Sequence, residues 1–366
     1  MSIAVSRLDV LGFRLRAQQL DRSHGSVEDT AILDIGVQDS GPDGALWALS
    51  IRGLRDPVPH ELASVWTIRG APHVYRRADL PVVAAAVEPF SDADAGKRIY
   101  DAAKPLKAAG IANLDALDAV ATAMRQVVRA PMVKGEVSRQ VTQLLDEPLL
   151  RFCRPCDATH PYEMSFRLSA FRAGLELRPG TSPPVLEPIR LPTAGAGFVP
   201  AATVPDRVNL IRAYLRLLGP ATPNHVAAYL DAPLRDVKAH WPSDTVAVSV
   251  EGQRRWVLAA DQGGLQEGPP GTTRLLGPFD LFLQARDRDL LVPDITRVKV
   301  MWPVLGRPGA VLVDGEIAGM WRPRKSAAKL SLWVEIWGTA NRRRIDEQAE
   351  QLAAHRGLQL SAVHVT

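Results

Sequence analysis

Three adjacent polar residues, Gln38, Asp39 and Ser40, interrupt an otherwise apolar stretch of the chain. A side-chain amide offers both a hydrogen-bond donor and an acceptor, so a glutamine can orient a water molecule for attack on a substrate. Residues two positions apart point the same way on an extended chain and opposite ways on a helix. A pair of such groups therefore works best where a helix ends.

The segment before these residues is expected to be that helix. Val27–Val37 carries apolar residues on one side, and the turn Gly41-Pro42-Asp43-Gly44 cannot continue a helix beyond Asp39. Gln38 would then project from the end of the helix into a cleft. Two further short segments are expected next, Ala45–Ile51 and a helix over Pro59–Val65.

A second polar cluster, Arg69-Gly70-Ala71-Pro72-His73, lies within Trp66–Tyr75. This stretch is predicted to be a hairpin that turns at Gly70. Arg69 and His73 would then lie near the bend, where they either contact a substrate or brace the hairpin.

Cys153, Cys156 and His160 form a third polar group. A structural zinc site needs four ligands, usually from two cysteine pairs, and this chain has one pair; His160 and Glu163 could complete a mixed set. A redox Cys-x-x-Cys normally opens a helix, which the surrounding prolines disfavour. We therefore prefer two ordinary thiols in a turn and assign no metal and no cofactor.

The order of these motifs resembles the winged-helix DNA glycosylases of the AlkZ/YcaQ type. In that family a helix ends in Gln-x-Gln or Gln-x-Asp, followed by an Ala-Leu-Trp-like and then an Arg-Gly-Thr-x-His-like segment. The matching residues here are Gln38-Asp39-Ser40, Ala45-Leu46-Trp47 and Arg69-Gly70-Ala71-Pro72-His73. Leu275–Asp294 also resembles the corresponding part of the family, so the resemblance covers nearly the whole chain.

The resemblance implies an enzyme that hydrolyses the N-glycosidic bond of bulky or crosslinked alkylpurines. An N7-alkylated purine already carries positive charge and leaves without a strong general acid. The enzyme must therefore chiefly hold a water and stabilise an oxocarbenium-like sugar. Gln38 matches the first catalytic amide of the family. Ser40 departs from the pattern because it is too short to replace the second, and Asp39 could take over if the backbone were rotated locally.

The composition is that of an ordinary globular protein. The chain has 366 residues, of which 46% are hydrophobic, and no run of 18 apolar residues that could span a membrane. The first residues do not form a signal peptide, and two cysteines in the whole chain indicate a reducing compartment, so we expect a cytoplasmic protein. The net charge of +4 permits nucleic-acid binding without requiring it.

The first half of the chain is predicted to be largely helical. Ser6–Arg22 has apolar residues at helical spacing with arginines between them, which favours a solvated basic face over contact with a DNA backbone. Asp92–Ala109 should be mostly helical with a kink or break at Pro105, and Asn113 should cap a helix over Leu114–Val128. A helix over Lys134–Leu145 takes the position of a recognition helix and should expose Glu136, Ser138, Arg139 and Gln143.

A winged helix-turn-helix is predicted after the proline-rich stretch Arg178–Pro205, which should be an extended linker. Three helices followed by a two-stranded hairpin are typical of that fold. Its third helix displays Arg235 and Lys238 as candidate DNA contacts. The expected elements are helices Arg207–Leu218, Pro223–Leu230 and Leu234–Trp241 and strands Thr245–Val250 and Arg254–Leu258.

The last hundred residues are predicted to be mostly strand. Asp314-Gly315 between alternating runs indicates a hairpin, and a helix over Arg342–Arg356 precedes a final strand. The expected strands are Val298–Val304, Ala310–Val313, Glu316–Trp321 and Lys329–Trp337. Positive charge concentrates here, serving either solubility or phosphate contact, at Arg322, Arg324, Lys325, Lys329 and Arg342 to Arg344. The Asp-Arg pairs of Leu275–Asp294 are interpreted as structural ion pairs.

These segments predict an α+β protein of three tandem winged helix-turn-helix units and a β-rich C-terminal domain. The expected boundaries are 1–78, 79–178 and 206–265 for the three units, 179–205 for the linker and 266–366 for the C-terminal domain. The expected partner is double-stranded DNA, damaged or intact, bound by a monomer without membrane contact. Two functions remain open: a monofunctional DNA glycosylase, or a non-catalytic winged-helix DNA-binding protein such as a regulator or lesion binder.

Overall fold

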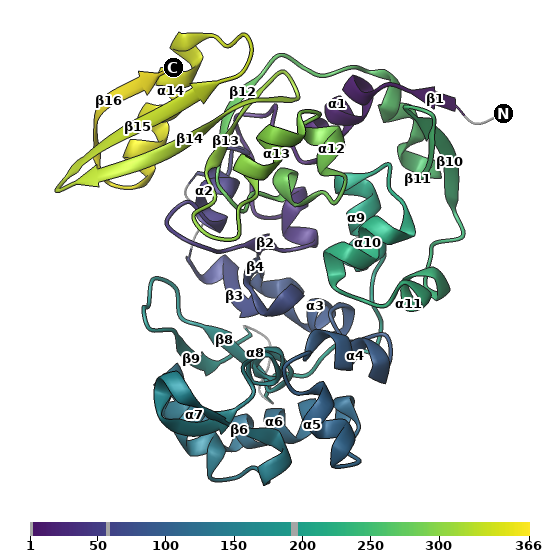
Figure 1. Cartoon of the computed structure of the whole chain (residues 1–366), viewed down its shortest axis with the longest axis vertical. Helices are drawn as coiled ribbons and strands as arrows, with labels where there is room; N and C mark the ends of the chain where they lie inside the picture. The colour runs from purple at the N-terminus through teal and green to yellow at the C-terminus, as the bar shows by residue number, and fades with distance from the viewer. Residues whose placement is uncertain (1–2, 56–58, 192–196) are drawn as a thin grey trace. The chain divides into compact units, whose positions relative to one another are not determined.

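The computed structural model describes residues 3–55, 59–191 and 197–366 (Figure 1). The chain divides into two compact units. Unit 1 comprises residues 1–57, 211–229 and 242–366, and unit 2 comprises residues 58–210 and 230–241. Both units mix helices with sheets, as the α+β class requires. Within the described residues, no helix is long and apolar enough to cross a membrane.

The main sheet of unit 1 is formed by its C-terminal part. Its strand order is β12-β13-β14-β15-β16, antiparallel except for the parallel pair β15-β16, which the helix α14 (Arg342–His355) connects. Alternate residues of β15 are buried, and α14 covers one face of the sheet (Figure 1). The strands are β12 (Thr273–Leu276), β13 (Gly309–Val313), β14 (Glu316–Ser326), β15 (Lys329–Ile336) and β16 (Gln359–Val365).

The predicted hairpin at Asp314-Gly315 is confirmed, and its turn has a clear backbone cause. Both residues have positive φ, 48° and 87°, which Asp and Gly tolerate better than other residues. The strand over Lys329–Trp337, the helix after Arg342 and the final strand are confirmed as well.

The remaining elements of unit 1 surround a second, smaller sheet. Its strand order is β1-β10-β11, with β1 parallel to β10 and β10 antiparallel to β11. The elements are β1 (Ile3–Val5), α1 (Arg7–Ala17), β2 (Val37–Gln38), α2 (Ala45–Ser50), most of α9 (Leu210–Leu218) and α10 (Pro223–Leu230), β10 (Thr245–Val250), β11 (Gln253–Leu258), α12 (Arg288–Leu291) and α13 (Ile295–Met301).

Unit 2 places helices around a sheet whose strands β4, β3, β8, β9 and β5 are neighbours in that order. Every residue of β3 is buried, and the core joins Trp66 to Phe166 and Met124. The strands are β3 (Leu62–Trp66), β4 (Pro72–Arg76), β5 (Met132–Val133), β8 (Leu175–Leu177) and β9 (Val185–Pro188), and β6 (Leu150–Cys153) pairs with β7 (Ala158–Pro161). The helices are α3 (Leu80–Ala86), α4 (Asp92–Arg98), α5 (Ala103–Ala108), α6 (Asn113–Val127), α7 (Lys134–Thr142), α8 (Glu163–Arg172) and α11 (Leu234–Ala239).

The helix predicted over Val27–Val37 is wrong. The structure has a short 3₁₀ helix at Ala31–Asp34 and then strand β2, which ends at Gln38. The side chain of Thr30 donates to the Ser26 carbonyl at 2.6 Å, a local bond that competes with helix formation. Gly36 then takes φ 88°, which an α-helix cannot contain. Gln38 consequently lies on extended chain.

The prediction that the arginines of Ser6–Arg22 form a solvent-exposed face is also wrong. Helix α1 forms with Ser6 as its N-cap, but Arg14 is fully buried and pairs with Asp287. Arg16 also turns inward and donates to the Gly264 carbonyl at 2.9 Å. Both arginines hold segments of unit 1 together; Arg14 has no contact with solvent, and the Arg16 side chain is 23% exposed.

Two helix limits in unit 2 differ from the prediction. The break in Asp92–Ala109 falls between α4 and α5, and Pro105 lies in the first turn of α5, where its missing N–H leaves no hydrogen bond unmade. Asn113 is the first residue of α6 and not its cap; the carboxylate of Asp92 accepts from the Leu114 N–H at 3.0 Å instead. Arg139 on α7 and Gln143 at its C-cap are exposed as expected, whereas Glu136 and Ser138 are half-buried.

Three further predictions, one of a helix, one of a strand and one of a linker, are wrong. Pro59–Val65 contributes mainly to the buried strand β3, not to a helix. Val298–Val304 is helical up to Met301, because the Asp294 side chain caps α13 by accepting from the Thr296 N–H at 2.8 Å. The stretch Arg178–Pro205 is not a bare linker, since β9 within it pairs with β8 and β5; its residues 192–196 lie outside the described part.

The hairpin at Gly70 and the elements predicted between residues 206 and 265 form close to their expected bounds. Helices α9 and α10 belong mainly to unit 1, whereas α11 belongs to unit 2. The interpretation of these elements as winged helices, and the domain boundaries, stay predictions.

Candidate active site

Gln38 is held by two side chains of unit 1. Its Nε2 donates to Oγ of Ser40 at 3.0 Å, and its Oε1 accepts from Nε2 of Gln284 at 3.3 Å. Ser40 follows Gln38 by two residues, just after the end of β2, and the bond between them shows that the two side chains meet. Gln284 is 7% exposed and also donates to the Phe279 carbonyl. The amide of Gln38 therefore has a fixed direction.

Asp39 lies between these two residues and points to the start of helix α2. Its Oδ1 accepts from the Ala45 N–H at 3.0 Å, which satisfies one of the unpaired donors at that helix end. A Cβ on Gly44 would come within 2.6 Å of the same oxygen, so a glycine fits there. Burial raises the pKa of Asp39 above its usual value.

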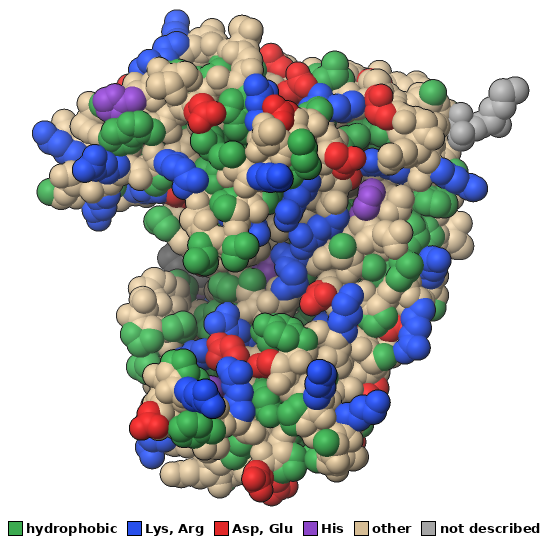
Figure 2. Space-filling view, in the orientation of Figure 1, with side chains coloured by type: hydrophobic (Ala, Val, Ile, Leu, Met, Phe, Trp, Pro, Cys, Tyr) green, Lys and Arg blue, Asp and Glu red, His purple; other side chains and the backbone are tan. Residues whose placement is uncertain are grey.

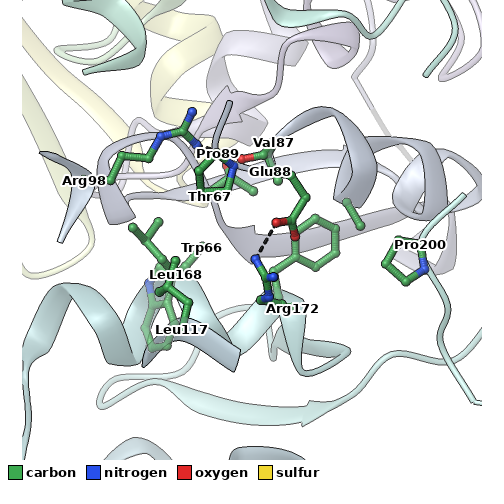
Figure 3. Close-up of a pocket in the computed structure, with 12 residues that line it drawn as sticks. Trp66, Thr67, Val87, Glu88, Pro89, Arg98, Leu117, Leu168, Arg172 and Pro200 are labelled. Atoms are coloured by element: carbon green, nitrogen blue, oxygen red, sulfur yellow. Dashed lines mark hydrogen bonds and ion pairs between the residues drawn. The ribbon is translucent and has the colours of Figure 1, made fainter. Parts of the chain in front are cut away.

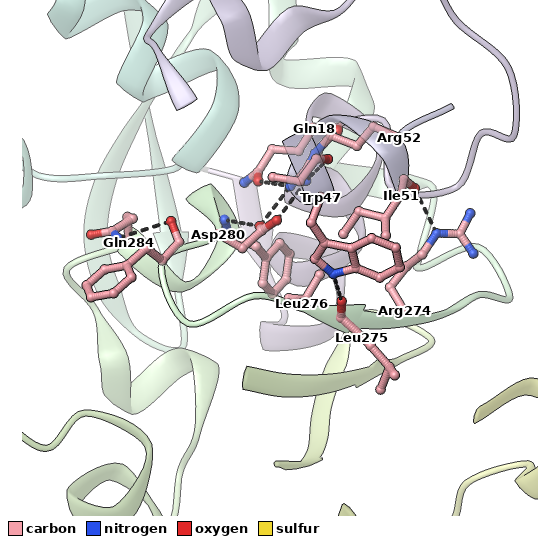
Figure 4. Close-up of polar contacts among 12 residues, drawn as sticks. Gln18, Trp47, Ile51, Arg52, Arg274, Leu275, Leu276, Asp280 and Gln284 are labelled. Atoms are coloured by element: carbon pink, nitrogen blue, oxygen red, sulfur yellow. Dashed lines mark hydrogen bonds and ion pairs between the residues drawn. The ribbon is translucent and has the colours of Figure 1, made fainter. Parts of the chain in front are cut away.

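Buried ion pairs fix both ends of the segment that carries Gln284. Asp280 accepts two bonds of 2.8 Å from Arg52, and neither side chain is exposed (Figure 4). Asp287 accepts bonds of 3.0 and 2.7 Å from Arg14 and also pairs with Arg255. The predicted structural role of the acidic residues in Leu275–Asp294 is confirmed for these two, although their partners come from distant segments.

The Ala-Leu-Trp segment forms the start of helix α2 and contacts the chain just before the segment that carries Gln284. Trp47 is buried and its indole N–H donates to the Leu275 carbonyl at 2.8 Å (Figure 4). Trp321 on β14 donates to the next carbonyl, that of Leu276, at 2.9 Å. These two bonds fix the chain just before the segment that carries Gln284.

Three arginines of unit 1 lie near one another, and two of them, Arg286 and Arg288, closely follow Gln284 in the chain. Arg286, Arg288 and Arg307 each lie over an aromatic ring, at 6.0, 5.1 and 5.2 Å from its centroid. Burial and the positive charges of the other two lower the pKa of Arg288. None of the three has an ion-pair partner among residues 3–55, 59–191 and 197–366, in contrast to Arg14 and Arg52. We call them the arginine cluster.

The arginine cluster adjoins a hollow of about 500 Å³ in unit 1, lined by Arg286, Arg288 and Asp289 and otherwise by apolar side chains. Figure 2 shows Lys and Arg side chains close together over the part of unit 1 that contains α12 and α13. Arg286 and Arg288 outnumber Asp289, the one carboxylate that lines the hollow, and this excess of positive charge favours an anionic ligand.

The predicted residues Arg69 and His73 belong to unit 2. His73 is buried, and its Nδ1 lies 3.1 Å from Oγ1 of Thr67 and 3.0 Å from the Ala71 carbonyl. Burial and the charge of Arg69 lower the pKa of His73 to about 3, so the ring is neutral. Arg69 has φ 57° at the bend of the hairpin. The bonds of His73 are those of a group that braces the hairpin.

The other predicted DNA contacts lie on exposed surfaces. Arg235 and Lys238 are exposed on α11 in unit 2. Arg322, Arg324 and Lys325 are exposed on β14 in unit 1. Arg324 lies 5.9 Å from the ring centroid of Trp333, which stacks on His364.

A separate small pocket in unit 2 is lined by residues that include Trp66, Thr67 and Leu168 and the ion pair of Glu88 with Arg172 (Figure 3). Its volume is about 40 Å³, enough for water but not for a nucleobase. It contains none of the predicted site residues.

Cys153, Cys156 and His160 come together in unit 2. Their possible ligand atoms all lie within 4.8 Å of one another. A hydrogen bond with His160 is the main cause that lowers the pKa of Cys153 to about 7, whereas a bond with Cys153 raises the pKa of Cys156.

A family model described as DNA glycosylase AlkZ-like matches residues 55–355. The chain belongs to the AlkZ-like DNA glycosylase family. This membership makes it an enzyme of the DNA glycosylase class, with a place in DNA repair and DNA as its substrate. The matched residues include Gln284 and the arginine cluster, while Gln38, Asp39 and Ser40 precede them.

A solved structure, that of the Streptomyces sahachiroi DNA glycosylase AlkZ, has the same fold as this AlkZ-like chain. The TM-score is 0.71, the sequence identity is 20%, and the match covers 100% of both chains. No curated protein matches the sequence.

Sequence reasoning misses Gln284 and the arginine cluster of this AlkZ-like enzyme. Gln284 lies inside the segment Leu275–Asp294, which resembles the family, but nothing in the sequence shows that it faces Gln38. The two closely spaced arginines Arg286 and Arg288 could have indicated an anion-binding site. From the sequence they are interpreted as ion-pair partners of neighbouring aspartates, whereas Asp287 pairs with Arg14 and Arg255.

Proposed function

We propose that this protein is a monofunctional DNA glycosylase that hydrolyses the N-glycosidic bond of bulky or crosslinked alkylpurines in double-stranded DNA. The observation that carries the proposal is the amide of Gln38, held between Ser40 and Gln284 in the unit that also contains the arginine cluster. No metal or cofactor takes part in the proposed step, and the protein acts as a monomer.

The proposed role of Gln38 is to position the attacking water. An amide oxygen has two lone pairs, and the bond from Gln284 uses one of them. The second lone pair can accept an O–H of the water and direct its oxygen at the anomeric carbon. As the C–O bond forms, the glycosidic electron pair leaves with the purine and the proton lost by the water passes to solvent. Because the direction of the amide is set before substrate binds, its reorganisation adds little to the barrier.

Ser40 and Asp39 complete the proposed catalytic group. Ser40 accepts from Gln38 and so fixes which end of the amide is the oxygen. Asp39 directs its carboxylate to the Ala45 N–H, and its proposed role is to stabilise the developing oxocarbenium ion from there by its negative charge. The alkylated purine departs with its own positive charge neutralised, so the site needs no strong acid.

The arginine cluster has the proposed role of binding DNA phosphates next to the site. Its three guanidiniums are partly buried over aromatic rings and lack carboxylate partners within the described chain. Phosphate contacts of this kind fix the register of a protein on DNA. Arg235, Lys238, Arg322, Arg324 and Lys325 are proposed as further contacts from exposed surfaces, and Arg69 and His73 as support.

A second function, non-catalytic DNA binding as a regulator or lesion binder, is favoured by one observation. Ser40 stands where the family motif has a second amide or a carboxylate. The arginine cluster would serve that function equally well. The presence of Gln284 against Gln38 speaks for the enzyme, because a protein that only binds DNA has no need of a fixed amide there.

The deciding experiment is base release from duplex DNA that carries an N7-alkylguanine. Wild type should produce alkali-labile abasic sites, and Gln38→Ala should reduce their rate by about 100-fold or more, as for other groups that act on the reacting atoms. Gln359→Ala, at an exposed glutamine of β16, serves as the control and should match wild type. Salt-sensitive binding without base release, on simple and crosslinked lesions, would establish the second function instead.

A further inference from the structure

We propose that Cys153, Cys156 and His160 bind one Zn²⁺ ion at the end of the β6-β7 hairpin. This site is independent of the proposed base-release chemistry. Its three side chains belong to one short segment, and their possible ligand atoms lie within 4.8 Å of one another. A tetrahedral zinc with Zn–S bonds of about 2.3 Å holds two thiolates roughly 3.8 Å apart, so small side-chain rotations are enough to close the site.

The hairpin places the ligands from two directions. Cys153 ends β6 and pairs with Ala158, while His160 pairs with Arg151 two residues along, so Cys153 and His160 lie on the same face of the hairpin. Cys156 comes from the turn between the strands. Asp157 has φ 47° and ψ 43°, and this left-handed residue returns the chain to β7 directly after the second cysteine.

The histidine is already oriented as a ligand. Nδ1 of His160 lies 2.8 Å from the Pro161 carbonyl, which only accepts hydrogen bonds, so Nδ1 carries the proton. Nε2 is left with its lone pair. Metal-binding histidines generally donate their other ring N–H to a carbonyl or carboxylate in this way, which fixes the tautomer and the direction of the ring.

The residues around the proposed zinc leave its fourth coordination position open to solvent. A hollow of about 360 Å³ lies beside the site and is lined by Cys156, His160 and Glu163. Glu163 already pairs with Lys134 and Arg167, both at 2.6 Å, so it is engaged elsewhere. Three protein ligands with an accessible fourth position hold zinc less firmly than four would. The zinc therefore acts as a clip for the hairpin and remains open to chelators.

The test is the zinc content of the full-length protein after expression in zinc-supplemented medium. Elemental mass spectrometry should find about one zinc per chain in wild type, in line with one three-ligand site. Cys153→Ser, Cys156→Ser and His160→Gln should each fall to background. His364→Gln changes an exposed strand histidine and should keep the zinc. Circular dichroism establishes that each variant is folded.

A second measurement keeps the assignment falsifiable if zinc is lost during purification. Co²⁺ added to the apoprotein should give thiolate-to-metal charge-transfer absorption that weakens in each single cysteine variant and disappears in the double variant. A chelator should speed amide exchange in β6 and β7 of wild type and leave Cys153→Ser unchanged. Equal zinc in all variants, no cobalt–thiolate absorption, or a Cys153–Cys156 disulfide that excludes metal would each overturn the proposal.

Discussion

Nε2 of Gln284 lies 3.3 Å from Oε1 of Gln38, although 246 positions separate the two residues in the chain. The contact joins the end of β2 to a segment that buried ion pairs hold at Asp280 and Asp287. It gives the Gln38 amide a partner on its oxygen, while Ser40 holds its nitrogen. Gln284 is therefore the positioning residue of the proposed site.

The first prediction concerns Gln284. Gln284→Ala should slow base release by about 10-fold, less than Gln38→Ala, because it loosens the amide without removing it. Gln284→Glu keeps the shape but replaces the donor with a carboxylate, and should be as slow as the alanine variant. Single-turnover rates of abasic-site formation at saturating enzyme measure this. A Gln284→Glu variant as fast as wild type would show that the hydrogen bond is unimportant.

The second prediction separates the charge of Asp39 from its capping bond. Asp39→Asn retains an acceptor for the Ala45 N–H, so its unfolding free energy should be close to wild type, while base release should fall about 10-fold because the negative charge is gone. Asp39→Ala should lose in addition about 1 kcal/mol of stability. Chemical denaturation and single-turnover kinetics on the same preparations measure both. Full activity in Asp39→Asn would show that Asp39 caps helix α2 but takes no part in base release.

The raised pKa of Asp39 adds a pH dependence to this test. Its carboxylate takes up a proton at a higher pH than an ordinary aspartate, so falling pH removes the negative charge early. Base release by wild type should therefore decline on the acid side, and Asp39→Asn should lack that part of the decline. The pH profile of the single-turnover rate shows whether the two curves converge at low pH, as the proposal requires.

The third prediction concerns the arginine cluster. Arg288→Ala and Arg307→Ala should weaken DNA binding and reduce the slope of log K against log salt by about 0.9 for each phosphate that is no longer neutralised. Arg178→Ala removes an exposed arginine that pairs with Glu187 and is not among the proposed DNA contacts, and it should leave the slope unchanged. Fluorescence anisotropy over a salt series measures the slopes. Equal slopes in wild type, the two cluster variants and the control would show that the arginine cluster does not contact DNA phosphates.

Local patterns in the sequence predict the fold best where one strong signal determines the backbone. Asp314-Gly315 marks a hairpin because both residues accept positive φ, and alternation in Lys329–Trp337 marks a half-buried strand. The prediction for Val27–Val37 fails because apolar content alone does not distinguish a helix from a buried irregular segment. The side-chain bond of Thr30 and the backbone of Gly36 decide that case.

The site is predictable only in part. The polar triplet identifies Gln38, but its partners depend on contacts between distant segments, which no local pattern records. Arg14 illustrates the limit: its spacing on α1 suggests an exposed basic face, whereas Asp287 makes burial of the charge possible. The local sequence does not distinguish a buried arginine from an exposed one, because burial depends on a carboxylate partner elsewhere in the chain.

The fourth prediction tests the buried ion pair of that arginine. Asp287→Ala leaves Arg14 and Arg255 buried without their carboxylate and should destabilise unit 1 by about 3–5 kcal/mol. Asp346→Ala breaks the exposed pair with Arg342 and should cost about 0.5 kcal/mol or less. Urea unfolding followed by tryptophan fluorescence compares the two. Similar losses in both variants would contradict the structural role given to Asp287.

The fifth prediction follows from the pKa of His73, which burial lowers from 6.5 to about 3. Below pH 6.5 the unfolded chain binds a proton at this histidine and the folded chain does not, so stability falls as pH decreases from 6.5 towards 3. At pH 5 this one group should remove about 2 kcal/mol relative to pH 7.5. His73→Gln should lose stability at pH 7.5 but show a weaker decline on acidification, whereas His24→Gln, at an exposed histidine, should decline as wild type does. Unfolding free energies of the three proteins at both pH values measure this, and parallel declines in wild type and His73→Gln would contradict the neutral, buried state of the ring.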